Sequence, residues 1–126
     1  MRILLDTAAQ IFAVESTHQL SKRAAAALQD PDNLLELSAV SLVELAIKTS
    51  LGKLSIPEHV ARQALEDLDL RVLPYTAEHA FRLFGLPRHH NDPFDRQIIA
   101  QALCERIPVI TPDEKFHLYA GIRVVW

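Results

Sequence analysis

The chain has 126 residues and a formal net charge of −3, and 49% of its residues are hydrophobic and 23% are charged. This length suits one domain, expected to span residues 1–126, and it excludes two domains with separate cores. The negative charge excludes an overall basic surface for nucleic acid, but it does not exclude a local one. Six basic residues could form such a local rim: Lys22, Arg23, Lys48, Lys53, Arg88 and Arg96.

Hydropathy and cysteine content indicate the compartment. No apolar run reaches the roughly 18 residues of a membrane span, and no signal peptide opens the chain. The single cysteine, Cys104, excludes an internal disulfide. Its position on the apolar side of a predicted helix indicates packing rather than nucleophilic chemistry. We therefore expect a cytoplasmic protein without a membrane partner.

Strands and helices alternate along the predicted chain. The apolar run Ile3-Leu4-Leu5 has no polar alternation, which is typical of a strand buried on both faces. The expected elements, in chain order, are a strand at 3–5, helices at 7–14 and 20–29, a turn at 30–33, a strand at 35–40, a helix from a cap at 41 to 51, a helix at 58–68, a strand at 71–74, helices at 77–84 and 93–105, a strand at 107–111, a helical turn around 116 and a strand at 122–126. This alternation predicts an α/β fold, a three-layer α/β/α sandwich around a central, mainly parallel sheet.

Helix caps supply the clearest local signals. Ser41 and Glu44 have the spacing of a capping box at the start of one helix. The segment HHNDPFDRQIIAQA, residues 89–102, runs from a loop into a buried helix, with Asp92 as the expected N-cap before a proline at the first helical position. Asp95 then lies in the first turn, where the helix dipole favours a carboxylate. Two acids are therefore expected at the start of a buried helix.

Connectivity places further acids near the same edge of the sheet. Asp6 ends the first strand, Glu44 is expected in the first turn of the helix after the second strand, and Asp113 follows the strand at 107–111. Ligands of open parallel sheets bind beyond the carboxyl ends of the strands. Asp95 joins these residues only if its helix presents its N-terminus to that edge, which the sequence alone does not establish.

Each acid also has a local explanation, as a helix cap or as a favourable charge in a first turn. Four carboxylates close together would repel, however, and such a cluster normally shares protons or binds a cation. Ligation by oxygen alone favours Mg²⁺, or Mn²⁺, over Zn²⁺. His89 and His90 are expected in a solvated loop rather than as a ligand pair.

At these residues the sequence resembles the PIN-domain ribonucleases, and specifically the VapC toxins of type II toxin–antitoxin pairs. The resemblance covers nearly the whole length, and its most specific part is the DPFDR segment with the helix that follows. The motifs that carry it are LLDT at 4–7, SLVELAIKTSLGKL at 41–54, LPRHHNDPFDRQIIAQA at 86–102 and TPDEKF at 111–116. It implies a PIN-like fold and a magnesium-dependent endoribonuclease.

The resemblance also implies roles for individual residues. Asp6, Glu44, Asp95 and Asp113 would be the four acids that hold one or two magnesium ions, while a water attacks an RNA phosphodiester. Glu44 and Asp113 would reach the metal either directly or through water. Asp92 would be an auxiliary acid beside the four.

Two further residues have alternative roles under the same resemblance. Thr111 would either orient Asp113 or a water at the metal, or cap the following helical turn. Arg96 would contact a phosphate or a partner, or only pair with a neighbouring acid. Ala8 and Ala9 follow the Asp-Thr pair, where similar proteins often carry a polar or aromatic residue, so no substrate contact is expected from this turn.

The expected partners are an RNA substrate, a second copy of the chain, and an antitoxin whose C-terminal segment occupies the active-site groove. An inserted arginine would suit an acidic groove. Two rival folds fail at particular positions: a receiver domain needs an aspartate at the end of the strand near 71–75, and a haloacid dehalogenase-type phosphatase needs an aspartate where Ala8 stands. A non-catalytic PIN-like module that binds RNA or protein remains the alternative.

Overall fold

The computed structural model describes all residues from 1 to 126. Its elements are β1 (Arg2–Leu5), α1 (Thr7–Glu15), η1 (Thr17–Gln19), α2 (Lys22–Gln29), β2 (Leu34–Ser38), α3 (Ala39–Ser50), α4 (Glu58–Asp67), β3 (Arg71–Leu73), α5 (Ala77–Arg82), η2 (Leu83–Gly85), α6 (Pro93–Glu105), β4 (Val109–Ile110), η3 (Glu114–Leu118) and β5 (Val124–Val125). The η elements are short 3₁₀ helices. No helix combines the length and the apolar character that crossing a membrane would require.

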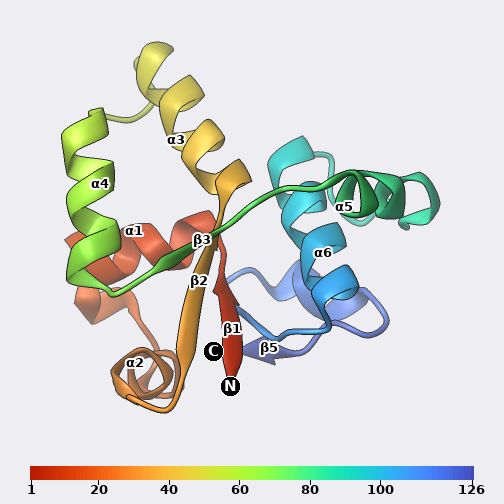
Figure 1. The fold of residues 1–126 in the computed structure, drawn as a ribbon, viewed down its shortest axis with the longest axis horizontal. Helices are drawn as coiled ribbons and strands as arrows, with labels where there is room; N and C mark the ends of the chain where they lie inside the picture. The colour runs from red at the N-terminus through yellow and green to blue at the C-terminus, as the bar shows by residue number, and fades with distance from the viewer.

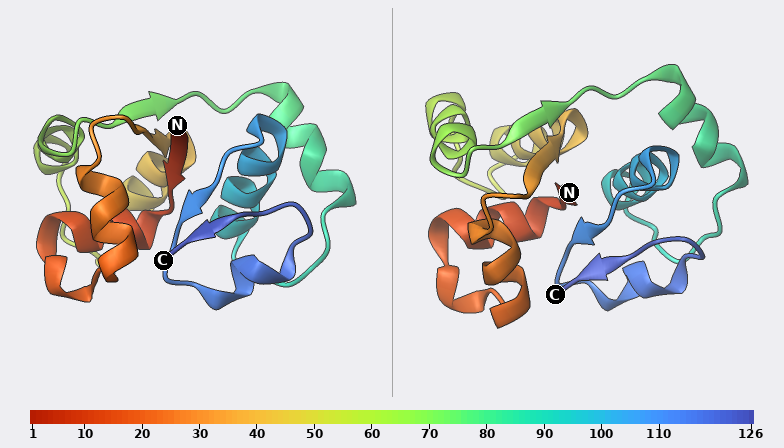
Figure 2. Two further views of the ribbon diagram at one scale, coloured as in Figure 1. Left: turned by 90° about the horizontal axis from the view of Figure 1, so that it is seen from below. Right: turned by 60° about the horizontal axis from the view of Figure 1, so that its bottom comes forward.

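The five strands form one sheet in the order β3-β2-β1-β4-β5, and all four strand pairs are parallel. Helices α1 and α2 lie on one side of β1 and α6 lies on the other (Figure 2). The predicted α/β/α architecture with a parallel sheet is therefore confirmed. Parallel strands carry their carboxyl ends at the same edge, where the chain enters α1 after β1 and α3 after β2 (Figure 1).

The central strand packs against a core on each face of the sheet. Leu4 contributes to a cluster with residues of α6 and η3, including Ile98 and Phe116. Ile3 and Leu5 point to the opposite face and join residues of α1, α2 and β2. Because the side chains of a strand alternate between faces, the unbroken apolar run of β1 supplies both cores. The end of β1 is thereby held rigidly between two layers.

Helix α3 begins earlier than the capping-box spacing predicts. The strand β2 ends at Ser38, whose hydroxyl accepts a hydrogen bond from the backbone N–H of Val40 at 3.1 Å and so caps α3. Ser41 is instead buried inside the helix, and its hydroxyl is hydrogen-bonded to that of Thr7 at 2.9 Å. The predicted cap at Ser41 is therefore wrong, and Glu44 lies in the second turn of α3 rather than in a capping box.

Other ends of elements also differ from the predicted ones. Helix α2 starts only at Lys22, after a cap at Ser21 and the short η1. The last two strands contain two residues each, because the register pairs only Val109 and Ile110 with β5. The predicted cap at Asp92 is confirmed, and Thr76 likewise caps α5. Each accepts a hydrogen bond from a backbone N–H in the first turn of its helix.

A charged network closes the opposite, amino-terminal end of the sheet. Arg2 donates through Nε to Glu36 Oε1 at 2.5 Å and through Nη2 to Glu105 Oε1 at 2.9 Å. The second oxygen of Glu105 lies 3.2 Å from Nε2 of the buried His79. Arg2 and His79 together lower the pKa of Glu105. The network joins β1 and β2 to the last turn of α6 and to α5.

We expect Arg2→Leu to destabilise the protein by about 2 kcal/mol in urea unfolding, because it leaves the carboxylate of Glu36 buried without a partner. The control is Arg62→Leu, which breaks an ion pair with Glu58 of the same kind on an exposed helix face and should cost less than about 0.5 kcal/mol. Equal losses in the two variants would contradict a special role for the buried pair.

Candidate functional site

Five acidic side chains line a cavity of about 270 Å³ at the carboxyl edge of the sheet. One basic side chain, that of Lys48, also lines it. The acids that line the cavity are Asp6, Glu44, Asp92, Asp95 and Asp113. They come from the end of β1, from α3, from the start of α6 and from the segment after β4, so four separate parts of the chain meet here.

Asp6 is the most deeply held acid, with only 3% of its surface exposed. Its Oδ1 accepts a hydrogen bond from the backbone N–H of Ala9 at 2.7 Å and caps α1. Its Oδ2 accepts a hydrogen bond from the hydroxyl of Thr111 at 2.5 Å. Burial raises the pKa of Asp6 to about 7, although these two hydrogen bonds favour the charged form. Asp6 is thus fixed in place and carries an unusually basic carboxylate.

Glu44 is buried between a hydroxyl and an ammonium group. Its Oε1 accepts a hydrogen bond from Thr7 at 2.6 Å, and its Oε2 accepts one from Lys48 at 2.5 Å. The hydrogen bond to Glu44 raises the pKa of Lys48, which also lies near Asp92 and Asp95. Lys48 is therefore a tethered counter-ion at the acidic cavity.

The start of α6 supplies two acids with different surroundings. Asp92 caps the helix, since its Oδ1 accepts a hydrogen bond from the N–H of Phe94 at 2.8 Å. The pKa of Asp95 is raised to about 6, chiefly by burial and also by the charges of Asp92, Glu44 and Asp113, while His90 acts in the opposite direction. Helices α3 and α6 lie side by side, which brings Asp95 toward Glu44 (Figure 1). Asp95 is thus a half-buried acid whose charged form is disfavoured by burial and by three neighbouring carboxylates.

Asp113 is held by a histidine that was expected in solvent. Its Oδ2 lies 2.7 Å from His90 Nε2, and its Oδ1 accepts a hydrogen bond from the N–H of Lys115 at 2.9 Å. His90 is 5% exposed and its Nδ1 lies 2.9 Å from the hydroxyl of Tyr119. The expectation of a solvated loop is therefore wrong for His90, while His89 is exposed as expected.

Thr111 and Arg96 form hydrogen bonds that hold other parts of the site in place. The hydroxyl of Thr111 donates to Asp6 and accepts a hydrogen bond from the backbone N–H of Asp113 at 3.0 Å, so it connects two of the acids. Arg96 forms no ion pair. Its guanidinium donates to the carbonyl oxygens of Pro87 and Leu86, at 2.8 and 3.2 Å, and so fixes the loop that precedes α6.

The donor set of the cavity fits a hard divalent cation. Buried carboxylates with raised pKa values would be stabilised by a positive ion, and oxygen donors match the preference of Mg²⁺ and Mn²⁺. His90, Asp95 and Asp113 each offer a ligand atom within 4.8 Å of the others. Both ring nitrogens of His90 are already hydrogen-bonded, which leaves the carboxylates as the available donors.

Three further residues, Lys48, Thr7 and His90, take part in this site although no sequence motif predicts that role. Lys48 follows Glu44 by one helical turn, and this spacing of opposite charges is a readable signal of an ion pair. Thr7 and His90 carry no such local signal. Their partners Ser41 and Tyr119 are distant in the sequence, so only the fold brings each pair together.

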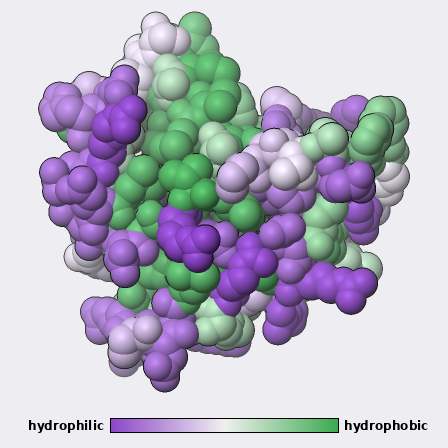
Figure 3. All heavy atoms as spheres, viewed as in Figure 1, coloured by the Kyte–Doolittle hydropathy of each residue, from purple (hydrophilic) through white to green (hydrophobic).

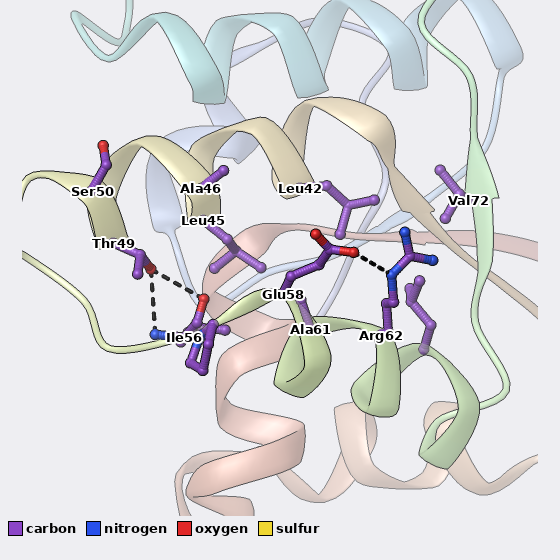
Figure 4. Close-up of a pocket in the computed structure, with 12 residues that line it drawn as sticks. Leu42, Leu45, Ala46, Thr49, Ser50, Ile56, Glu58, Ala61, Arg62 and Val72 are labelled. Carbon is purple, nitrogen blue, oxygen red and sulfur yellow. Dashed lines mark hydrogen bonds and ion pairs between the residues drawn. The ribbon is translucent and has the colours of Figure 1, made fainter.

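A second hollow of about 530 Å³ lies between α3 and α4 and has a different character. Its wall is mainly apolar, with Leu42, Leu45 and Ala46 of α3 facing Ala61 and Leu65 of α4. Figure 3 shows apolar surface between these helices, and Figure 4 shows that the Glu58–Arg62 ion pair borders it. The groove lacks a cluster of acids or nucleophiles, so it is suited to binding rather than to chemistry.

Comparison with known proteins is consistent with this geometry. The sequence model of the PIN domain matches residues 3–122. No curated protein matches the chain.

Several solved structures share the fold at low sequence identity. The crystal structure of VapBC2 from Rickettsia felis, bound to a DNA fragment from its promoter, aligns with a TM-score of 0.70 and 19% identity over 98% of this chain and 97% of that one. The structure of FitAcB from Neisseria gonorrhoeae aligns with a TM-score of 0.64 and 23% identity over 98% and 96% of the two chains. VapBC-5 from Mycobacterium tuberculosis, of the VapBC toxin–antitoxin family, aligns with a TM-score of 0.59 and 23% identity over 98% and 97%. At such identities the likeness establishes the fold.

Because the pKa of Asp95 is about 6 instead of 3.8, we expect the free energy of unfolding to depend on pH. Between these values the folded chain binds more protons than the unfolded chain, so the free energy of unfolding falls as pH rises from about 4 to 6. Asp95→Asn should therefore be more stable than the wild type at pH 8 in chelator, by about 1 kcal/mol after allowance for partial exposure, or roughly 4 °C in Tm. The advantage should vanish at pH 4.

The control for this measurement is Asp32→Asn, which removes an exposed charge outside the cavity and should leave Tm nearly unchanged at both pH values. A loss of stability in Asp95→Asn at pH 8 would mean that the attraction of Asp95 to the start of α6 outweighs repulsion from its neighbours.

Lys48→Met should raise the affinity for Mn²⁺ in isothermal titration by roughly tenfold, because it removes a positive charge that competes with the ion for the same carboxylates. The variant should also be less stable than the wild type in chelator, since Glu44 loses its counter-ion. Lys53→Met, which changes an exposed lysine without an ion pair, is the matched control. Weaker Mn²⁺ binding by Lys48→Met would show that Lys48 supports the ion site rather than competing with it.

Proposed function

The chain belongs to the PIN-domain family, and on that basis we propose that it is a magnesium-dependent endoribonuclease. The proposed reaction is hydrolysis of RNA phosphodiester bonds at the cavity lined by Asp6, Glu44, Asp95 and Asp113, within a single domain of residues 1–126. One observation carries the proposal: buried and half-buried acids from four parts of the chain line one small cavity, and burial raises the pKa of two of them. Such an arrangement costs stability unless a cation compensates it.

Asp6 and Asp95 are the best candidates to hold the ion. Asp6 is fixed by two hydrogen bonds, while the structure records no hydrogen bond to the carboxylate of Asp95. When bound, Mg²⁺, or Mn²⁺ in its place, would activate water and stabilise the negative charge that develops on the phosphoryl oxygens. Asp92 adds negative charge beside Asp95 while it caps α6.

Glu44 and Asp113 are proposed to act at one remove from the ion. Each of these carboxylates already has a side-chain nitrogen partner that competes with a cation, Lys48 for Glu44 and His90 for Asp113, whereas Asp6 has none. Their second oxygens accept hydrogen bonds from the hydroxyl of Thr7 and from the backbone N–H of Lys115. These groups are therefore placed to orient or deprotonate a water through one remaining lone pair. Lys48 is the one basic side chain that lines the cavity, and it would also attract the phosphate of the substrate.

We further propose that the chain is the toxin of a toxin–antitoxin pair, in the cytoplasm and as a homodimer. Support comes from the fold that it shares with VapBC and FitAcB structures. The apolar groove between α3 and α4 suits an apolar helix of an antitoxin, and the acidic cavity suits an arginine that follows this helix. Both surfaces include residues of α3, so one partner segment could reach them together.

The alternative is a non-catalytic PIN-like module that binds RNA or protein. Such a module gains nothing from a buried acidic cluster, which repels RNA and weakens the fold. An intact acid set with an internal lysine counter-ion therefore favours the enzyme.

Asp95→Asn should lower RNA cleavage by roughly two orders of magnitude or more, because it removes a charge that helps to hold the ion. Total RNA is incubated with the purified chain in magnesium or in chelator, and the new ends are mapped by sequencing. The wild type should cleave only with magnesium, and circular dichroism should show that the variant remains folded. Asp32→Asn is the control and should cleave like the wild type. Undiminished cleavage by Asp95→Asn would remove this residue from the mechanism, and absence of cleavage by the wild type would favour the binding module.

A further inference from the structure

A series of hydrogen bonds runs from the buried Tyr119 and His90 to the half-buried Asp113. The hydroxyl of Tyr119 lies 2.9 Å from His90 Nδ1, and His90 Nε2 lies 2.7 Å from Asp113 Oδ2. The three residues come from the end of η3, from the loop before α6 and from the segment after β4. These hydrogen bonds therefore connect two loops that carry acids of the cavity.

Packing fixes the orientation of the His90 ring. The ring plane lies within 15° of that of Tyr119, with the centroids 5.6 Å apart, and it meets the ring of Phe116 edge-on at 5.3 Å. Phe116 and Tyr119 are themselves buried. A ring held in this way directs Nε2 at Asp113 before any ligand arrives.

The acceptor determines which nitrogen carries a proton. An ionised carboxylate only accepts hydrogen bonds, so the contact with Asp113 requires a proton on His90 Nε2. The hydroxyl of Tyr119 can either donate to Nδ1 or accept from it, so this conclusion is the same for the neutral and for the charged ring. Nε2 then has no lone pair for a metal ion, even though His90 lies close to Asp95 and Asp113.

Asp113 is the acid that most needs such support. It follows a two-residue strand, and a third of its side chain is exposed. Its other oxygen accepts a hydrogen bond from Lys115, so His90 and the start of η3 hold the carboxylate from two directions. Hydrogen-bond partners behind a ligand commonly determine its orientation.

We propose that His90 is a positioning residue, held by Tyr119, that donates a hydrogen bond to Asp113 and aligns this carboxylate toward the cavity without itself binding the metal ion. The proposal rests on the proposed function for the role of Asp113, but the direction of the hydrogen bond can be tested without activity. It distinguishes His90 from a direct ligand and from a residue that only fills space.

The test uses the full chain in four forms: the wild type, His90→Gln, His90→Leu and Tyr119→Phe. Glutamine retains an N–H donor near the position of Nε2, leucine retains bulk without a donor, and phenylalanine removes only the hydroxyl that holds the ring. An exposed histidine outside the site supplies the matched control, His59→Gln, which should behave like the wild type. His89 is unsuitable because its ring meets that of Tyr119 edge-on at 4.8 Å. Affinity for Mn²⁺ is measured by calorimetry, and kcat and KM are measured with a short RNA that the wild type cleaves.

We expect His90→Leu to lower kcat by roughly 10- to 100-fold with little change in KM, and His90→Gln to restore most of this loss. Tyr119→Phe should lower kcat by a smaller factor. The affinity of His90→Gln for Mn²⁺ should stay within about threefold of the wild type, because the amide replaces a donor and not a ligand. Equal and large losses of Mn²⁺ affinity in His90→Gln and His90→Leu would identify His90 as a ligand and overturn the proposal. Wild-type kcat in His90→Leu would reduce its role to packing.

A spectroscopic measurement covers the case in which a variant does not fold or the chain does not cleave RNA. In metal-free wild-type protein, ¹⁵N-edited NMR of the histidine rings should show a proton on Nε2 of His90. An unprotonated Nε2 would overturn the proposal whatever the activity. Conversely, wild-type protein that binds Mn²⁺ with a protonated Nε2 but leaves RNA intact would support the role of His90 and contradict the ribonuclease.

Discussion

Partial removal from water and mutual repulsion destabilise the charged carboxylates of one small cavity, and the surrounding scaffold holds them together nonetheless. Five acids line a space of about 270 Å³, and burial weakens their access to water. The chain compensates in part with hydrogen bonds from Ala9 and Thr111 to Asp6 and with an ammonium group beside Glu44. The compensation is incomplete, as the raised pKa values of Asp6 and Asp95 show. A site that remains under electrostatic strain without a cation has a built-in affinity for one.

The scaffold resists this strain because the elements that carry the acids are anchored in two cores. β1 is buried on both faces and ends at Asp6, and α6 packs through Ile98 and Ile99 immediately after the turn that carries Asp95. The acids therefore cannot move apart without breaking apolar contacts on one side of the sheet. At the opposite end, opposite charges attract in the network around Arg2, which fastens β1 and β2 to the last turn of α6. Attractive ion pairs thus stabilise the amino-terminal end of these strands, and repelling carboxylates lie at their carboxyl end.

Local signals explain how much the sequence could predict. Asp6 after an apolar run, Asp92 before a proline and the alternation of strands and helices are patterns within a few residues, and the parallel sheet and these caps follow from them. The start of α3 is ambiguous because Ser38 and Ser41 are both good caps. Thr7, which bonds to Ser41, decides between them. The burial of His90 depends on Tyr119, whose position is known only once β4 and η3 are in place. The start of α3 and the burial of His90 are determined by contacts between distant segments, which local secondary-structure propensities do not reveal.

Helix α3 couples the two hollows of the molecule. Glu44 and Lys48 point from it into the acidic cavity, whereas Leu42, Leu45 and Ala46 line the apolar groove on its other side. The groove side of α3 is apolar and faces α4, and the cavity side carries the ion pair of Glu44 with Lys48. Any ligand that shifts α3 within the groove must therefore move Glu44 relative to Asp95 on α6, and so change the field at the cavity. If a groove ligand did shift α3, the groove ligand and a cation at the cavity would alter each other's affinity by the same factor.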